Sequence, residues 1–227
     1  MPGTNVGGAV RLDLTGLDRM LAALTDDGYE VIGPTVDQGA IVHDSVRSVS
    51  DLPVGWTDQQ EAGHYRLKRR SDRAVFGYVV GPQSWKKHLF PSRLRLWKAS
   101  KQDGRLEVQT DEDTTPPRYA FIGVRSCEIH AMGIQDKVFT DGSLKDNDYV
   151  QRRNGAFIVG VNCTEPGGTC FCVSMNTGPK ASSGYDLSIT EVLQGEDHYF
   201  VVVSGSKRGT DLLARLPSAE ATPKENR

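Results

Sequence analysis

The chain has 227 residues, 37% of them hydrophobic and 25% charged, and its formal net charge is −2 at pH 7. This composition is typical of a globular protein with one large domain or two small ones, and it provides no general basic field for nucleic acid. No apolar run approaches the roughly 20 residues that cross a bilayer, and the first residues lack the basic and apolar stretches of a signal peptide. We therefore expect a cytoplasmic protein with no membrane span and no nucleic-acid partner.

The first hundred residues predict one helix and two hairpins. Residues 1–16 are expected to be flexible, and residues 17–24 place apolar side chains at the i, i+3, i+4, i+7 spacing of a short helix. Short apolar segments bounded by turn residues predict the two hairpins, formed by 29–33 with 40–43 and by 65–69 with 76–80. Residues 17–101 are therefore interpreted as an N-terminal helix and sheet unit.

Two basic stretches of this unit allow more than one interpretation. Residues 68–70 (KRR) are most simply a solvated face. Residues 85–98 (WKKHLFPSRLRLWK) are basic and amphipathic, which also suits a membrane surface or nucleic acid, but Pro91 would interrupt a long helix. We favour a docking segment that packs four apolar side chains against the core, namely Leu89, Phe90, Leu94 and Leu96. The polar residues 102–117 then predict a mobile link.

The second half has the pattern of an α/β fold. Apolar runs at 119–124 (YAFIGV) and 156–161 (AFIVGV) predict buried parallel strands, and 128–139 predicts the helix between them. Such a β–α–β unit is right-handed in nearly all cases. We further expect strands at 187–192 and 199–204, a helix at 210–216 and a disordered tail at 218–227. The predicted class is α/β with mixed α+β character, and residues 118–217 form a unit with a cysteine-bearing sheet edge.

All four cysteines of the chain lie in this second half. Cys127 follows the first buried strand by three residues, and Cys163 follows the second by two. Parallel strands end at the same edge of a sheet, where open α/β folds place their ligands. The topology therefore brings Cys127 and Cys163 together although 35 residues separate them.

The other two cysteines, Cys170 and Cys172, lie in a glycine-containing loop (EPGGTCFC). Gly167 and Gly168 permit a tight turn and a close approach to a bulky group, and their backbone N–H groups are candidate donors to sulfur. We expect this loop to fold back so that all four sulfur atoms converge. Four thiolates at one place repel one another unless a cation or a cluster neutralises them.

The cysteine spacing leaves the nature of the site open. The pattern C-x35-C-x6-C-x-C matches neither the paired C-x2-C of zinc ribbons nor the C-x2-C-x2-C-x3-C run of ferredoxins. We favour an iron–sulfur cluster held by the four cysteines. Tetrahedral zinc, or buried thiols with no metal, are the alternatives.

Three arginines near these motifs are further candidates. Arg125 could offset the negative charge of a cluster with its guanidinium, or could pair with Asp136 or Glu128. Arg152 and Arg153 could bind an anion or a partner subunit, or could form a salt-bridged turn. Neither the G-x-G-x-x-G nor the G-x-x-x-x-G-K-[ST] pattern occurs, so the sequence contains no nucleotide-binding motif.

Several unusual motifs occur together in one order: GVRSCEIHAMGIQDKVF, DNDYVQRRNGAFIVGVNC, TCFCVSMNTGP and GYDLSITEV. From about residue 119 to residue 216 the chain resembles the N-terminal half of the iron–sulfur beta subunit of cytosolic nickel–iron sulfhydrogenases. It is also similar to the A subunit of anaerobic sulfite reductase. The segment WKKHLFPSRLRLW resembles the family more weakly.

The resemblance implies an electron-transfer role without catalysis by this chain. In that family the subunit relays electrons between a partner that handles flavin and nicotinamide and a catalytic subunit. The resemblance points to an iron–sulfur cofactor, 4Fe-4S in type, and to Cys127, Cys163, Cys170 and Cys172 as the matching cysteines. Family members usually continue into a two-cluster ferredoxin-type domain, and these 227 residues contain no such run. A non-redox docking subunit with structural zinc or buried thiols is the alternative function.

Overall fold

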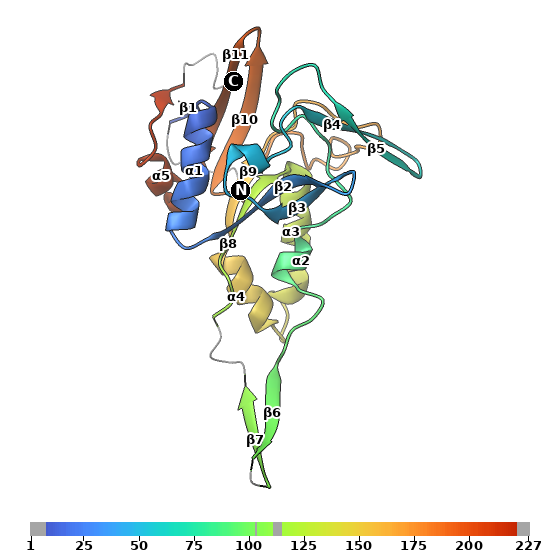
Figure 1. The fold of residues 1–227 in the computed structure, drawn as a ribbon, viewed down its shortest axis with the longest axis vertical. Helices are drawn as coiled ribbons and strands as arrows, with labels where there is room; N and C mark the ends of the chain where they lie inside the picture. The colour runs from blue at the N-terminus through green and yellow to red at the C-terminus, as the bar shows by residue number, and fades with distance from the viewer. Residues whose placement is uncertain (1–7, 103, 111–114, 222–227) are drawn as a thin grey trace.

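The computed structural model describes residues 8–102, 104–110 and 115–221 (Figure 1). The helices are α1 (Leu14–Asp26), α2 (Lys86–Leu89), α3 (Ser126–Phe139), α4 (Asn147–Gly155) and α5 (Lys207–Leu213), with a 3₁₀ turn η1 (Val49–Asp51). The strands are β1 (Val10–Leu12), β2 (Glu30–Asp37), β3 (Ala40–Ser45), β4 (Trp56–Glu61), β5 (His64–Arg69), β6 (Trp97–Gln102), β7 (Arg105–Thr110), β8 (Tyr119–Val124), β9 (Phe157–Val161), β10 (Leu187–Gln194), β11 (Asp197–Ser204) and β12 (Ala219–Glu220). Within the described ranges, no helix has both the length and the apolar character needed to cross a membrane.

An eight-stranded mixed sheet forms the centre of the molecule, with the order β12-β1-β11-β10-β9-β8-β2-β3. The inner strands β2, β8, β9 and β10 run parallel, and the flanking pairs are antiparallel. The expected β–α–β unit is confirmed, with α3 and α4 in the crossover between β8 and β9. The α/β class is therefore confirmed, and strands from both the N-terminal and the cysteine-containing regions are hydrogen-bonded into one sheet.

Alternating side chains of the central strands point to two separate cores. On β8 and β9, Ile122 and Val159 face one side with the apolar face of α1, whereas Phe121 and Ile158 face the other side with α3 and α4. Two-residue alternation on a strand buried on both faces produces this division. The predicted helix at 17–24 is confirmed as part of α1, whose N-cap Asp13 accepts a hydrogen bond from the Gly16 N–H at 2.7 Å.

The second predicted hairpin is wrong in its pairing. The β5 strand pairs with β4, which precedes it, and residues 76–80 form no strand. The first hairpin is confirmed as β2 and β3, with β2 continuing through Pro34 to Asp37. Parts of both ends expected to be flexible are ordered: β1 begins at Val10, and β12 follows α5 near the C-terminal end. Residues 1–7 and 222–227 lie outside the described residues.

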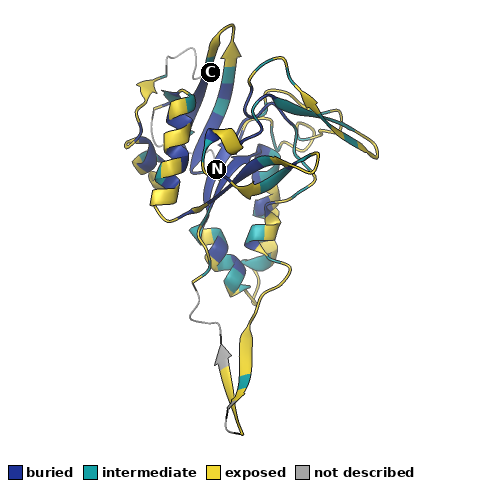
Figure 2. Ribbon diagram, in the orientation of Figure 1, coloured by how far each residue is buried: buried dark blue, intermediate teal, exposed yellow. Residues whose placement is uncertain are grey.

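A two-stranded ribbon of β6 and β7 projects away from the body (Figure 1), where the sequence predicted a docking segment and a polar link. Only Leu89 of the predicted docking side chains is fully buried, whereas Phe90, Leu94 and Leu96 are exposed. The ribbon is exposed along most of its described length (Figure 2). Trp97 is 61% exposed and Leu106 is 70% exposed, so the ribbon lies outside the core.

Candidate cysteine site

Two of the cysteines, Cys127 and Cys163, lie at the carboxyl edge of the parallel strands, as the topology predicted. Cys127 occupies the first turn of α3 directly after β8, and Cys163 follows the last residue of β9 by two positions. The Cys163 N–H donates to the Pro179 carbonyl at 3.2 Å, which ties the strand end to the segment after the cysteine loop. A Cβ on Gly178 would lie 3.2 Å from Cys172 Sγ, so this segment also lies against the loop. All four thiols are free.

The sulfur atoms lie close enough to act on one another electrostatically. Burial, together with the negative charges of Glu128, Cys163 and Cys172, raises the pKa of the Cys127 thiol to about 11. Burial also raises the pKa of Cys163, which Arg125 lowers and the charges of Cys170 and Cys172 raise. The pKa values of Cys127 and Cys163 therefore depend on the charges of the other cysteines. At Cys127 and Cys163 the thiolate form is therefore disfavoured unless another positive charge is present.

The sulfurs are neighbours without forming a closed ligand set. In the described part of the chain, no group of three or more His, Cys, Asp or Glu side chains is arranged to hold a metal ion. Cys170 is exposed and the other three cysteines are half-buried. The thiol donor set suits an iron–sulfur cluster or zinc in its chemistry, but binding would require the loop at 163–172 to bring the sulfurs closer together.

Arg125 supplies a buried positive charge beside these cysteines. The residue is 2% exposed, and its Nη2 donates to the carbonyls of Phe76 and Tyr78 at 2.7 and 2.8 Å. Its Nε has no hydrogen-bond partner among the described residues. Burial by itself would lower its pKa, but nearby negative charges, including that of Cys163, raise it overall. The guanidinium pairs with neither Asp136 nor Glu128, and its charge remains available to an anionic site.

The segment at 75–80, which accepts hydrogen bonds from Arg125, is also held on its other side by a buried carboxylate. Glu191 on β10 is 7% exposed and accepts hydrogen bonds from the N–H groups of Val75 and Phe76 at 2.6 and 2.8 Å. His198 Nε2 lies 2.7 Å from the same carboxylate. The segment at 75–80 is thus held by side chains above the strand ends, next to the cysteine loop.

The glycines of the cysteine loop have different surroundings. The Gly167 N–H donates to Cys170 Sγ at 3.3 Å. A Cβ on Gly167 would lie 2.9 Å from Val79 Cγ2, whereas one on Gly168 would be in ordinary contact with the Gln60 carbonyl at 3.7 Å. The close approach predicted for these glycines therefore exists at Gly167, and it is to a valine side chain.

Sequence reasoning missed the role of Arg70, which it placed on a solvated face. Arg70 Nη1 and Nη2 lie 2.9 and 2.8 Å from the two carboxylate oxygens of Glu165, inside the cysteine loop. Arg70 also pairs with Asp72 and donates to the Gly77 carbonyl. Lys68 and Arg69 are exposed as predicted. The contact joins residues 95 positions apart, so no local signal could have found it.

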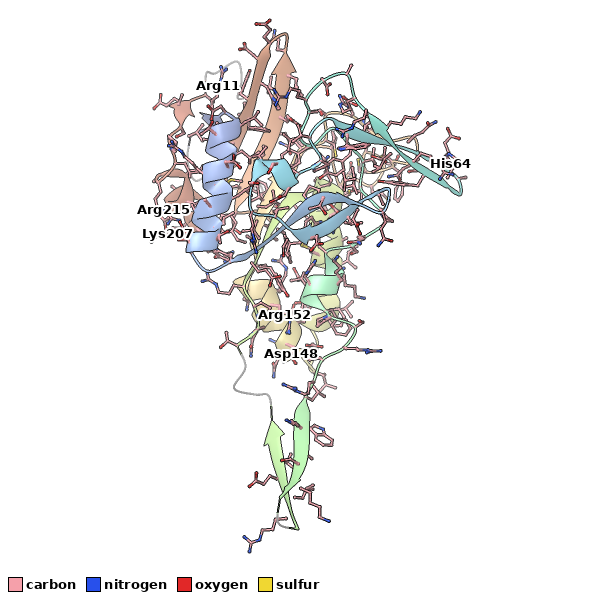
Figure 3. All side chains as sticks on the ribbon, in the orientation of Figure 1. Arg11, His64, Asp148, Arg152, Lys207 and Arg215 are labelled. Atoms are coloured by element: carbon pink, nitrogen blue, oxygen red, sulfur yellow. The ribbon has the colours of Figure 1, made fainter. Side chains whose placement is uncertain are left out.

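Arg152 and Arg153 form internal ion pairs. Arg152 Nη1 lies 3.6 Å from the Asp148 carboxylate one turn earlier on α4, and Figure 3 labels both residues. Arg153 Nε lies 3.0 Å from Asp136, which also accepts from the Tyr149 hydroxyl. The salt-bridged interpretation is therefore the correct one for these two arginines.

The chain was also compared with known proteins. No family model matches it. It is 34% identical over 115 residues to sulfhydrogenase 2 subunit beta of Pyrococcus furiosus, a match that covers 49% of this chain. The chain is similar to a sulfhydrogenase beta subunit. This confirms the resemblance expected from the motifs. The match covers 32% of that relative, so the chain spans about a third of the length of the protein it resembles.

Proposed function

We propose that this chain is an iron–sulfur electron-transfer part of a multi-subunit redox complex of the hydrogenase or sulfite reductase type. Cys127, Cys163, Cys170 and Cys172 would hold the cluster, of the 4Fe-4S type. The observation that supports this most is the position of Cys127 and Cys163 at one sheet edge, with the segment after the cysteine loop bonded to that edge and the buried Arg125 guanidinium beside it. The similarity to a sulfhydrogenase beta subunit agrees with a redox role.

A cluster at this place would supply one-electron redox chemistry. The chain's own groups would set the conditions for it. Arg125 offsets negative charge from the buried side, and the Gly167 N–H donates to the Cys170 sulfur. Both effects stabilise a more negative state of the site and so raise a reduction potential.

The proposed partners are a subunit that handles flavin and nicotinamide and a separate catalytic subunit. The chain itself would transfer electrons without catalysing a reaction. The proposed location is the cytoplasm, where thiols stay reduced. The name of the relative describes a subunit, which agrees with assembly into a complex.

Anaerobic purification followed by iron and sulfide assays tests the proposal. We expect a brown protein with a broad absorbance at roughly 400 nm that bleaches on reduction. Cys163→Ser and Cys172→Ser should each lower the bound iron and sulfide, with folding checked by circular dichroism. A colourless anaerobic protein without iron would contradict the proposal.

The alternative is a docking subunit with structural zinc or buried thiols. Stoichiometric zinc without sulfide would favour it, and the same cysteine substitutions would then lower stability rather than electron transfer. The exposed β6–β7 ribbon is compatible with docking in either case.

A further inference from the structure

A second candidate site lies away from the cysteines, around α2. An open pocket of about 570 Å³ is lined by three basic side chains, Lys86, Lys87 and Arg93, together with the hydroxyl residues Ser84 and Ser92. No acidic residue lines this outer pocket, and none of the three cations forms an ion pair within the described ranges. Lys87 Nζ is held by the His43 carbonyl and Gln83 Oε1, both at 2.7 Å. Like charges gathered in this way without a counter-charge favour an anion.

A smaller inner cavity of about 130 Å³ adjoins the outer pocket and shares Gln83, Ser84 and Lys86 with it. About 10–15 Å³ of such space is enough for one water, so the inner cavity has room for a small organic group. Its other lining residues include the apolar side chains of Val80 and Met132. The inner cavity is therefore a largely apolar extension of the basic outer pocket.

Two buried polar atoms of this inner cavity have no hydrogen-bond partner within the described residues. They are the Nε1 of Trp85, a residue that is 2% exposed, and the Oε1 of Gln135. The Glu128 carboxyl, which also lines the inner cavity, lies beside the indole. Buried donors and acceptors are normally satisfied. One unpaired donor and one unpaired acceptor on residues that line the same cavity are consistent with a guest that can both accept and donate.

We propose that the two pockets together bind a phosphate-bearing small molecule of the nucleotide class, with its phosphates between Lys86, Lys87 and Arg93 and its uncharged ring in the inner cavity. The ring accepts from Trp85 and donates to Gln135. Lysine and arginine supply charge-assisted hydrogen bonds to phosphate oxygens. Recognition by side chains on a short helix and the loop after it needs no glycine-rich loop, so the absence of nucleotide motifs in the sequence does not bear on it. The proposal goes beyond the redox role and is independent of it.

Isothermal titration of the full chain with ADP, adenosine and pyrophosphate tests the site. We expect ADP to bind at least about tenfold more tightly than either fragment, because each fragment fills only one pocket. Lys86→Gln and Arg93→Gln should each weaken ADP binding by about tenfold, the scale of one charge-assisted hydrogen bond. Gln135→Leu should weaken ADP but leave pyrophosphate unchanged.

The matched control is Lys98→Gln, which removes a cation of the same basic stretch on β6, outside both pockets. Its ADP affinity should stay within about twofold of the unaltered chain. The proposal is overturned if ADP does not bind at millimolar concentration, or if Lys98→Gln loses as much affinity as Arg93→Gln. Lys86 and Arg93 are exposed, so their substitution leaves the fold intact. The affinities expected for this site are the same whether or not the cysteines hold a metal. A negative result in the ADP titration would therefore contradict the nucleotide site and leave the proposed redox function unaffected.

Discussion

The guanidinium of Arg70 binds both carboxylate oxygens of Glu165, at 2.9 and 2.8 Å, and so connects the end of β5 to the loop that carries Cys170 and Cys172. Arg70 is largely buried, with 13% of its side chain exposed. Its hydrogen bonds hold the pKa of Glu165 below its usual range and lower that of Asp72 to about 2. The position of the cysteine loop therefore depends on a side chain from the N-terminal half.

Arg70→Gln should loosen this loop. We expect the substitution to lower the free energy of unfolding by about 1–2 kcal/mol, since the carboxylate partners are partly exposed. In the reduced, metal-free chain, alkylation of the half-buried Cys172, measured by mass spectrometry, should become several-fold faster. Arg69→Gln is the matched control, because Arg69 stacks on Trp56 at 3.7 Å and does not contact the loop. Equal alkylation rates in both variants would show that Arg70 does not hold the loop.

Glu191→Leu should be strongly destabilising. The substitution leaves the N–H groups of Val75 and Phe76 without their acceptor in a buried place, which costs about 2–4 kcal/mol. Urea unfolding measures the loss. Glu196→Leu, on the exposed turn between β10 and β11, should change stability by less than about 0.5 kcal/mol. A loss at Glu191 no greater than at Glu196 would contradict the role assigned to this carboxylate.

Acidification should destabilise the fold through two histidines. Burial, with the charge of Lys87, lowers the pKa of both His43 and His88 to about 4. The unfolded chain has histidine pKa values of about 6.5, so between these values it binds more protons than the folded chain. The free energy of unfolding should therefore fall as the pH drops from about 6.5 to about 4, and this contribution should level off below.

The expected loss is about 1–2 kcal/mol for each histidine, reduced from the full linkage value because both are only partly buried. Urea midpoints measured from pH 7.5 to pH 4 follow it. His43→Gln should flatten the profile, since it removes one of the two groups whose pKa differs between the folded and unfolded chain. His64→Gln, at the exposed start of β5, is the control and should leave the profile unchanged. A profile that His43→Gln leaves as steep as before would refute this account.

The parts of the fold that the sequence predicted depend on local patterns. The apolar runs of β8 and β9 identify strands buried on both faces, and their parallel pairing places Cys127 and Cys163 at one edge. The type of each element, and the side chains that it buries, depend on neighbouring residues, so these elements were predictable. The edge placement followed from topology alone.

The wrong prediction at residues 76–80 has a different cause. This apolar segment looks like a strand, but side chains satisfy its backbone instead of a neighbouring strand. Asp58 accepts from the Val79 N–H at 2.7 Å, and Arg125 donates to the carbonyls of Phe76 and Tyr78. These partners are distant in sequence, and no local pattern indicates them. The contact of Arg70 with Glu165, which supports the cysteine loop, could not be predicted from the sequence for the same reason.

Gly167 and Gly168 provide a comparison of adjacent residues within the cysteine loop. Gly167→Ala should lower the free energy of unfolding by about 1–3 kcal/mol, because the new methyl group would lie 2.9 Å from Val79 Cγ2 and the loop would have to move. Gly168→Ala adds the same methyl group at 3.7 Å from the nearest atom and should be close to neutral. Thermal and urea unfolding compare the two variants. Because the Gly167 N–H donates to Cys170 Sγ, any displacement by Gly167→Ala should also raise the alkylation rate of Cys170. Two variants of equal stability would mean that the loop accommodates the methyl group, and that its approach to Val79 does not fix the position of the cysteines.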